Sequence, residues 1–179
     1  TDGFVRQPEG TGTLNACPHG HFPSGDGKFL AIACTTDKMF ERLTIAMERK
    51  DLLEKFGEQA TRLKNRVEVL AEVEKWTRSL PRETLIDVCN NNGVPAGSIN
   101  SIADIFEDEH FKARETIKHV SVPGVGNVAV PNVFPTLSET PGEINNLGPG
   151  LGDHNEDLYR EELGLSDSEL STLKESGVI

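Results

Sequence analysis

The hydrophobic pattern of this chain changes its period once, and that change sets the fold class. In four stretches between residues 36 and 114, apolar side chains recur every three or four positions, the spacing that gathers them on one face of an α-helix. From residue 117 to 131, apolar and polar residues alternate around a glycine-rich turn, which is typical of an antiparallel hairpin. A short apolar run at 28–34, preceded by the turn SGDG, indicates a buried strand. The sequence therefore predicts an α+β fold.

Capping residues help to place the ends of the predicted helices. The predicted helices cover residues 35–48, 66–80, 81–93 and 102–114. Thr36 and Ser101 can accept a hydrogen bond from the first turn of the helices that follow them, and Gly93 suits the left-handed position after a helix. We expect the residues before 28 to form an irregular lead-in, and 94–101 to be a short connection.

Two further helices are predicted in the last part of the chain, after a segment rich in proline and glycine. They cover residues 156–164 and 166–177, and Ser166 with Glu169 has the spacing of a capping box. Isolated helices of this length are marginal in water. The tail should therefore need another surface to pack on.

Charge and cysteine content exclude several classes of protein. The formal net charge is -11, which disfavours binding to nucleic acid or to an anionic membrane surface. The three cysteines, at 17, 34 and 89, form no paired framework, so we expect a reducing compartment such as the cytoplasm. No apolar run approaches the ~20 residues of a membrane-spanning helix. The chain starts with neither Met nor a signal-peptide pattern, and we expect it to be part of a longer protein.

The segment NACPHGHFPSG, residues 15–25, gathers the most reactive-looking side chains. Cys17, His19 and His21 alternate there, and on an extended strand all three would face one side, as metal ligands do. Structural zinc sites usually draw a second ligand pair from a separate segment, and the other three histidines stand alone in the sequence. An ordinary loop, or a loop that faces a substrate, is favoured over a metal site.

Nucleophilic catalysis has little support from the sequence. Cys34 ends the predicted strand and Cys89 lies within a predicted helix, so both are expected to be small buried residues. No serine stands in a nucleophile motif. A Cys–His pair that uses Cys17 stays open as a minor alternative.

Two polar segments could be a phosphate-binding loop and an acid–base pair, but a structural role is favoured for each. The glycine-rich stretch 148–155 precedes a predicted helix, yet it lacks a phosphate-binding lysine, and an N-cap by Asp153 or Asn155 explains it better. The acidic run at 107–110 is expected to be a solvated helix end rather than an acid–base pair.

Four segments, taken in order, resemble the carboxy-terminal part of family III CoA-transferases from about residue 14 to 179. This family, also called CaiB/BaiF, includes formyl-CoA transferase, carnitine CoA-transferase and α-methylacyl-CoA racemase. The segments that carry the resemblance are PSGDGKFLAIACTTDKMFERL, GVPAGSINSIADIFEDEHFKAR, VPGVGNVAVPNVFPTLSETPG and GLGDHNEDLYREELGLSDSELSTLKESGVI.

The resemblance implies a two-domain subunit. The larger domain has a Rossmann-like α/β fold, built mainly from the amino-terminal half and completed by the last segment of the chain. The smaller α+β domain would cover residues 14–130, after a lead-in at 1–13. A linker at 131–152 and a helical tail at 153–179 would return to the larger domain. Two such subunits interlock as a homodimer in the family.

The resemblance also implies the chemistry. An Asp carboxylate of the family attacks an acyl-CoA thioester and forms a mixed anhydride, which becomes an aspartyl-CoA thioester before an acid takes the CoA. No position of this sequence matches that Asp, so no catalytic residue is assigned, and residues 1–179 alone are expected to be inactive. Coenzyme A would enter as part of the substrate, and no separate cofactor is expected.

One part of the family's site does fall in this chain. A loop just before the first strand of the small domain, glycine-rich in formyl-CoA transferase, covers the active site. ACPHGHFPSG holds that place here, so His19, Gly20 and His21 are predicted to contact substrate, with the imidazoles pairing with a carboxylic acid. Two alternatives stay open: a racemase of the α-methylacyl-CoA type, and a non-catalytic dimerisation or binding module.

Overall fold

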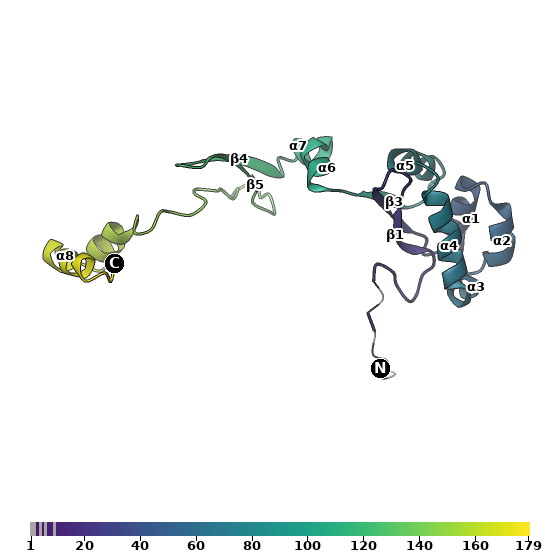
Figure 1. Ribbon diagram of the computed structural model, residues 1–179, viewed down its shortest axis with the longest axis horizontal. Coiled ribbons are helices and arrows are strands. Elements are labelled where there is room, and N and C mark those ends of the chain that lie inside the picture. The colour runs from purple at the N-terminus through teal and green to yellow at the C-terminus, as the bar shows by residue number, and fades with distance from the viewer. Residues whose placement is uncertain (1–2, 4, 6, 9) are drawn as a thin grey trace. The chain divides into compact units, whose positions relative to one another are not determined.

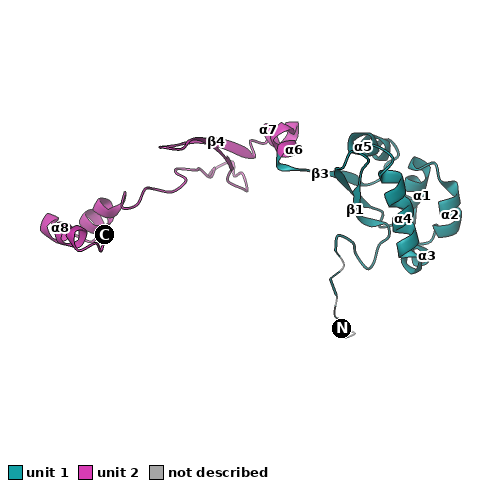
Figure 2. Ribbon diagram, viewed as in Figure 1, with its two compact units in different colours: residues 1–102 teal, residues 103–179 magenta. Residues whose placement is uncertain are grey.

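The computed structural model describes residues 3, 5, 7–8 and 10–179. The chain forms two compact units, Thr1–Ile102 and Ala103–Ile179, called unit 1 and unit 2 (Figure 2). Part of the expected lead-in at 1–13 lies outside the described residues. The domain bounds expected at 14, 130 and 152 stay predictions. They refer to the domains of a longer protein, whereas the two units are defined by contacts within residues 1–179.

Unit 1 contains a three-stranded antiparallel sheet in the order β1-β2-β3 (Figure 1). The strands are β1 (His19–Pro23), β2 (Phe29–Ala33) and β3 (Ala96–Ile99). The predicted strand at 28–34 is confirmed as β2. The expectation of irregular structure at 19–23, and of a mere connection at 94–101, was wrong. Both segments are short and lack alternation, and they become strands by pairing with the two edges of β2.

Five helices accompany the sheet of unit 1. They are α1 (Asp37–Ala46), α2 (Lys50–Phe56), α3 (Gln59–Lys64), α4 (Arg66–Thr77) and α5 (Arg82–Asn91). The predictions for α1, α4 and α5 are confirmed, with Thr36 accepting from the backbone N–H of Met39 and Gly93 at φ 63° after α5. Helices α2 and α3 went unpredicted because six or seven residues are too few to show a helical period.

The core of unit 1 lies between the sheet and the helices. Its fully buried members include Leu30 and Ile32 of β2 and Phe40 of α1. All three thiols of the chain are free and buried there. Burial raises the pKa of Cys34 to about 12 and that of Cys89 to about 11. These two thiols therefore stay protonated at neutral pH, as expected for small core residues.

An arginine stands at the centre of this core. Arg62 of α3 is fully buried. Its guanidinium donates to the carbonyls of Cys17, Phe56 and Gly57 at 2.7, 3.0 and 2.6 Å, and to the Asp37 carboxylate at 2.7 Å. One side chain thus ties the segment before β1 to three helices, and a buried arginine is tolerated because its N–H groups are satisfied.

Unit 2 contains a two-stranded hairpin, and two short helices precede the hairpin in the sequence. The elements are α6 (Ile102–Glu107), α7 (Glu109–Ala113), β4 (Ile117–Val122) and β5 (Gly126–Pro131). The hairpin prediction is confirmed. The single helix predicted at 102–114 is wrong, because the Asp108 carboxylate accepts from the backbone N–H groups of His110 and Phe111 and caps a new helix, α7. The acidic residues around it are exposed, as expected, apart from half-buried Asp108.

The tail ends in two helical elements that contact one another. Residues Asp157–Glu162 form a π-helix, η1, where an α-helix was predicted. The last helix, α8 (Asp167–Glu175), has the predicted capping box between Ser166 and Glu169. No described helix has the length and apolar character needed to cross a bilayer.

Unit 2 has almost no core of its own. Within residues 103–179, all of which are described, Leu170 is the one large apolar side chain that is buried. Exposed large apolar residues are instead spread along the unit: Phe106, Val125, Val133, Phe134, Leu137, Leu147, Leu151, Leu158, Leu163 and Val178. So many exposed apolar side chains indicate surfaces that pack on other protein.

Candidate functional site

A groove of about 370 Å³ in unit 1 brings together all three residues predicted to contact substrate. The groove lies where β1 contacts α4, and Figure 1 shows these two elements next to one another. His19, Gly20 and His21 come from β1. The remaining lining residues are Thr11 and Gly12 from the segment before β1, Phe22, and Arg66, Leu70 and Glu74 from α4.

The groove is closed on one side by the segment before β1. Strand β1 is an edge strand, paired with β2 alone, so alternate N–H groups face away from the sheet. The His21 N–H donates to Thr11 Oγ1 at 3.1 Å. A Cβ atom on Gly20 would lie 3.3 Å from the same oxygen, so the absence of a side chain lets Thr11 approach the strand closely.

The two histidines differ in exposure. His19 is half-buried, and its Nδ1 atom is buried without a hydrogen-bond partner among the described residues. His21 is exposed at the groove. An unpaired buried nitrogen costs about 1–3 kcal/mol and is rare in native structures, so the His19 Nδ1 atom has an unmet hydrogen bond beside the groove.

Cys17 does not join the histidines. Its side chain belongs to the core, and burial raises the pKa of the thiol. The extended strand starts only at His19, so the alternation that would align Cys17, His19 and His21 fails at its first member. Among the described residues, no group of three or more His, Cys, Asp or Glu side chains could hold a metal ion.

Arg66 gives the groove its positive charge. The guanidinium donates to the carbonyls of Thr13 and Leu14 at 2.7 and 2.8 Å. The carboxylate of Glu74, which also lines the groove, pairs with Arg78 at 2.6 Å. The positive Arg66 beside two imidazoles therefore makes a place for an anion on a chain whose net charge is -11.

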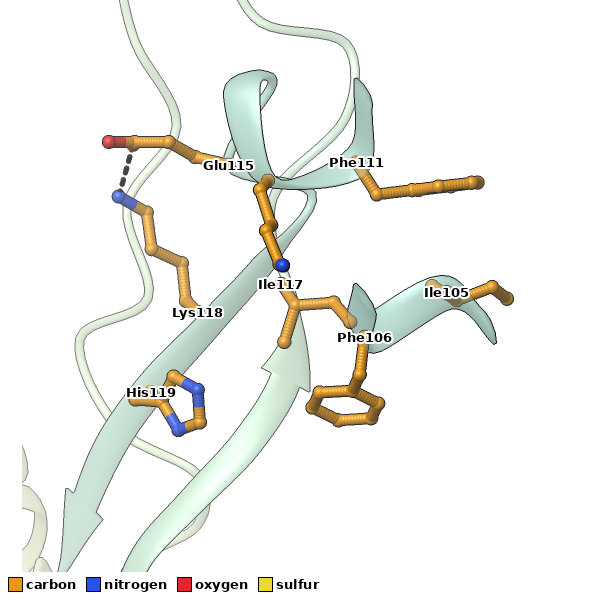
Figure 3. A pocket seen from close by; sticks show the side chains of 8 residues that line it. Ile105, Phe106, Phe111, Glu115, Ile117, Lys118 and His119 are labelled. Atoms are coloured by element: carbon orange, nitrogen blue, oxygen red, sulfur yellow. Dashed lines mark hydrogen bonds and ion pairs between the residues drawn. The ribbon is translucent and has the colours of Figure 1, made fainter. Parts of the chain in front are cut away.

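A second hollow, of about 430 Å³, lies in unit 2 between α6, α7 and β4 (Figure 3). Its cations pair with neighbouring acids: Lys118 with Glu115, as the dashed line in Figure 3 marks, and Lys112 with Glu109 at 3.0 Å. Ile105 and Phe106 give it an apolar side. Because its cations are already paired, this hollow is a weaker candidate for binding a charged substrate.

The glycine-rich stretch at 148–155 contains a hydrogen bond between its own backbone and one of its side chains. The Asp153 carboxylate accepts from the N–H of Gly150 at 2.7 Å. The expected N-cap by Asp153 or Asn155 was wrong, because η1 starts after Glu156 and has no side-chain cap. A carboxylate already occupies the N–H group that a phosphate would need.

Comparison with known proteins defines the class. The sequence model of CoA-transferase family III matches residues 1–155. The chain belongs to this family.

Two similar relatives are subunits of one kind of CoA-transferase. The chain is 49% identical to the succinyl-CoA–L-malate CoA-transferase alpha subunit of Chloroflexus aurantiacus, over 99% of this chain and 42% of that protein. It is 42% identical to the beta subunit from the same organism, over 92% of this chain and 41% of that protein. The chain spans less than half the length of these relatives.

A solved structure agrees with the fold. A CaiB/BaiF family protein from Brucella suis matches with a TM-score of 0.74 and 27% identity, over 89% of this chain and 41% of that chain. The small α+β arrangement of short antiparallel strands and several helices is thus shared with a member of the family.

Proposed function

We propose that this chain is the carboxy-terminal part of an enzyme that transfers CoA from succinyl-CoA to a hydroxylated dicarboxylic acid such as L-malate. The observation that carries the proposal is the 49% identity, over 99% of this chain, to a succinyl-CoA–L-malate CoA-transferase subunit. A second relative at 32% identity, named succinyl-CoA–D-citramalate CoA-transferase, has the same donor and a similar acid in its name.

The proposed reaction proceeds through an aspartate that lies outside residues 1–179. Its carboxylate attacks the donor thioester carbonyl, so that a mixed succinyl–aspartyl anhydride forms as the C–S bond breaks and CoA leaves as a thiolate. The thiolate attacks the aspartyl carbonyl, which releases succinate and leaves an aspartyl-CoA thioester. The acceptor carboxylate displaces the thiolate and forms a second anhydride. Attack of the thiolate on the acceptor carbonyl gives the new thioester and restores the aspartate.

The groove of unit 1 supplies the contact to the acid in this proposal. A carboxylate in the groove would lie beside the imidazoles of His19 and His21 and the Arg66 guanidinium. Hydrogen bonds to a charged partner contribute more than neutral ones. In a dicarboxylic acid, one carboxylate can be held here while the other reacts.

In this proposal, the exposed apolar residues of unit 2 form the contacts with the rest of the enzyme. They would pack on a larger Rossmann-like domain and on a second subunit, as in an interlocked dimer. Relatives named alpha and beta subunits support a multi-subunit enzyme. The three free thiols support a reducing location such as the cytoplasm.

The test is direct transfer of CoA by the intact gene product, purified with any subunit that stays bound. Incubation with succinyl-CoA and L-malate should give malyl-CoA and succinate in equal amounts, measured by mass spectrometry, and no product without the acid. Proton exchange at the α-carbon of a 2-methylacyl-CoA in deuterium oxide, without acid, would instead identify a racemase. A folded protein with neither activity would support the non-catalytic module.

A further inference from the structure

The segment at residues 11–18, called the strap, is held by its backbone. Four of its carbonyls accept hydrogen bonds from side chains at the start of α3, within α3 and at the start of α4. The pairs are Arg66 with Thr13 and Leu14 at 2.7 and 2.8 Å, Gln59 with Asn15, and Arg62 with Cys17 at 2.7 Å. Because the acceptors are carbonyls, these bonds fix the path of the strap whatever side chains it carries.

The strap is also one wall of the groove. Thr11 and Gly12 line it together with residues of β1 and α4, and Thr11 Oγ1 accepts from the N–H of His21. The groove is therefore assembled from three pieces of chain: the strap, β1 and α4. Their separation depends on what holds the strap.

Arg66 differs from the other two side chains that hold the strap. Arg62 is fully buried in the core, and Gln59 does not line the groove. Arg66 alone among the three lines the groove and bonds the strap, through the two terminal nitrogens of one planar guanidinium. It anchors the strap just beyond Thr11.

We propose that Arg66 is a positioning residue for acid binding. Its two hydrogen bonds to the strap carbonyls hold Thr11 against β1, and this contact sets the width of the groove around His19 and His21. The inference deepens the proposed function and rests on it: the ligands whose fit depends on this width are the carboxylic acid acceptor and the succinyl group of the donor, which also ends in a free carboxylate.

Two substitutions at Arg66 separate position from charge. In the intact gene product, Arg66→Gln loses both the charge and the paired donors, and Arg66→Lys keeps the charge but loses the planar fork. Misplacement of a binding wall by about 1 Å can cost about 100-fold in rate, so we expect KM for the acid to rise about tenfold or more in both variants. KM for succinyl-CoA should rise as well, because its succinyl group ends in a carboxylate that the same groove would hold.

Thr11 offers a test from the other side of the contact. Thr11→Val keeps the shape but removes the acceptor for the His21 N–H, and should also raise KM for the acid. Thr11→Ser keeps the hydroxyl and should restore it. Lys75→Gln, an equal change of charge at an exposed residue of α4, is the matched control and should change neither KM.

Hydrogen exchange gives a readout that does not depend on activity. In Arg66→Gln the amides of residues 10–21 should exchange faster than in the parent, with the melting temperature close to that of the Lys75→Gln variant. Unchanged exchange would overturn the positioning role. So would an Arg66→Lys enzyme with the parent's KM for the acid, because charge alone would then suffice. If the unsubstituted protein transferred no CoA, the proposed function would be overturned. The hydrogen-exchange result would still show whether Arg66 holds the strap in place.

Discussion

Replacing Arg62 with methionine is expected to lower the free energy of unfolding of the chain by about 3 kcal/mol, because each buried carbonyl left without a donor costs about 1–3 kcal/mol. Three carbonyls lose their partner, those of Cys17, Phe56 and Gly57. Methionine retains an apolar stem but not the cation that lies 4.6 Å from the centre of the Phe40 ring. Urea unfolding followed by circular dichroism measures the change.

The matched control for this prediction is Arg78→Met. Arg78 pairs with Glu74 at 2.6 Å, but its side chain is 60% exposed. Exposed pairs of this kind contribute less than about 1 kcal/mol. An Arg62→Met variant no less stable than Arg78→Met would contradict the central place given to Arg62 in the core.

The second large effect concerns the two units when they are produced separately. Residues 103–179 bury one large apolar side chain, Leu170, so they should show little helix and no cooperative unfolding on their own. Residues 10–102 contain the core cluster and should unfold in one cooperative transition. Circular dichroism during thermal unfolding distinguishes the two results. A cooperative transition for residues 103–179 would show that the exposed apolar side chains need no partner to pack on.

Local signals in the sequence predicted the longer elements well. Helices α1, α4 and α5 have enough residues for the period to show. The side chains of Thr36 and Ser166 cap helices as expected, and Gly93 follows α5 with a positive φ. Helices α2 and α3 and strands β1 and β3 are too short for a periodic signal. These strands exist because β2 has two edges to which they can pair.

The candidate groove could be predicted in part from the sequence. His19, Gly20 and His21 were expected at the active site because the family resemblance makes ACPHGHFPSG the loop that covers it, and the structure gathers all three in one groove. Their contact with substrate stays a prediction. Thr11 and Arg66 gave no signal, because their roles depend on contacts across 10 and more than 50 positions in the chain. Arg62 reads as an ordinary surface cation, and only the fold shows that backbone carbonyls surround it.

The most direct test of the account is the kinetics of a His19→Ala/His21→Ala variant of the intact gene product. Loss of a hydrogen bond to a charged group costs about 1.5–3 kcal/mol, so kcat/KM for L-malate should fall about 10- to 100-fold. KM for succinyl-CoA should rise in the same variant, because the succinyl group also ends in a carboxylate. His119→Ala, which removes an exposed histidine on β4, is the control and should leave both values as they are. Parent-like kinetics for the acid in the double variant would contradict the claim that this groove binds the acceptor.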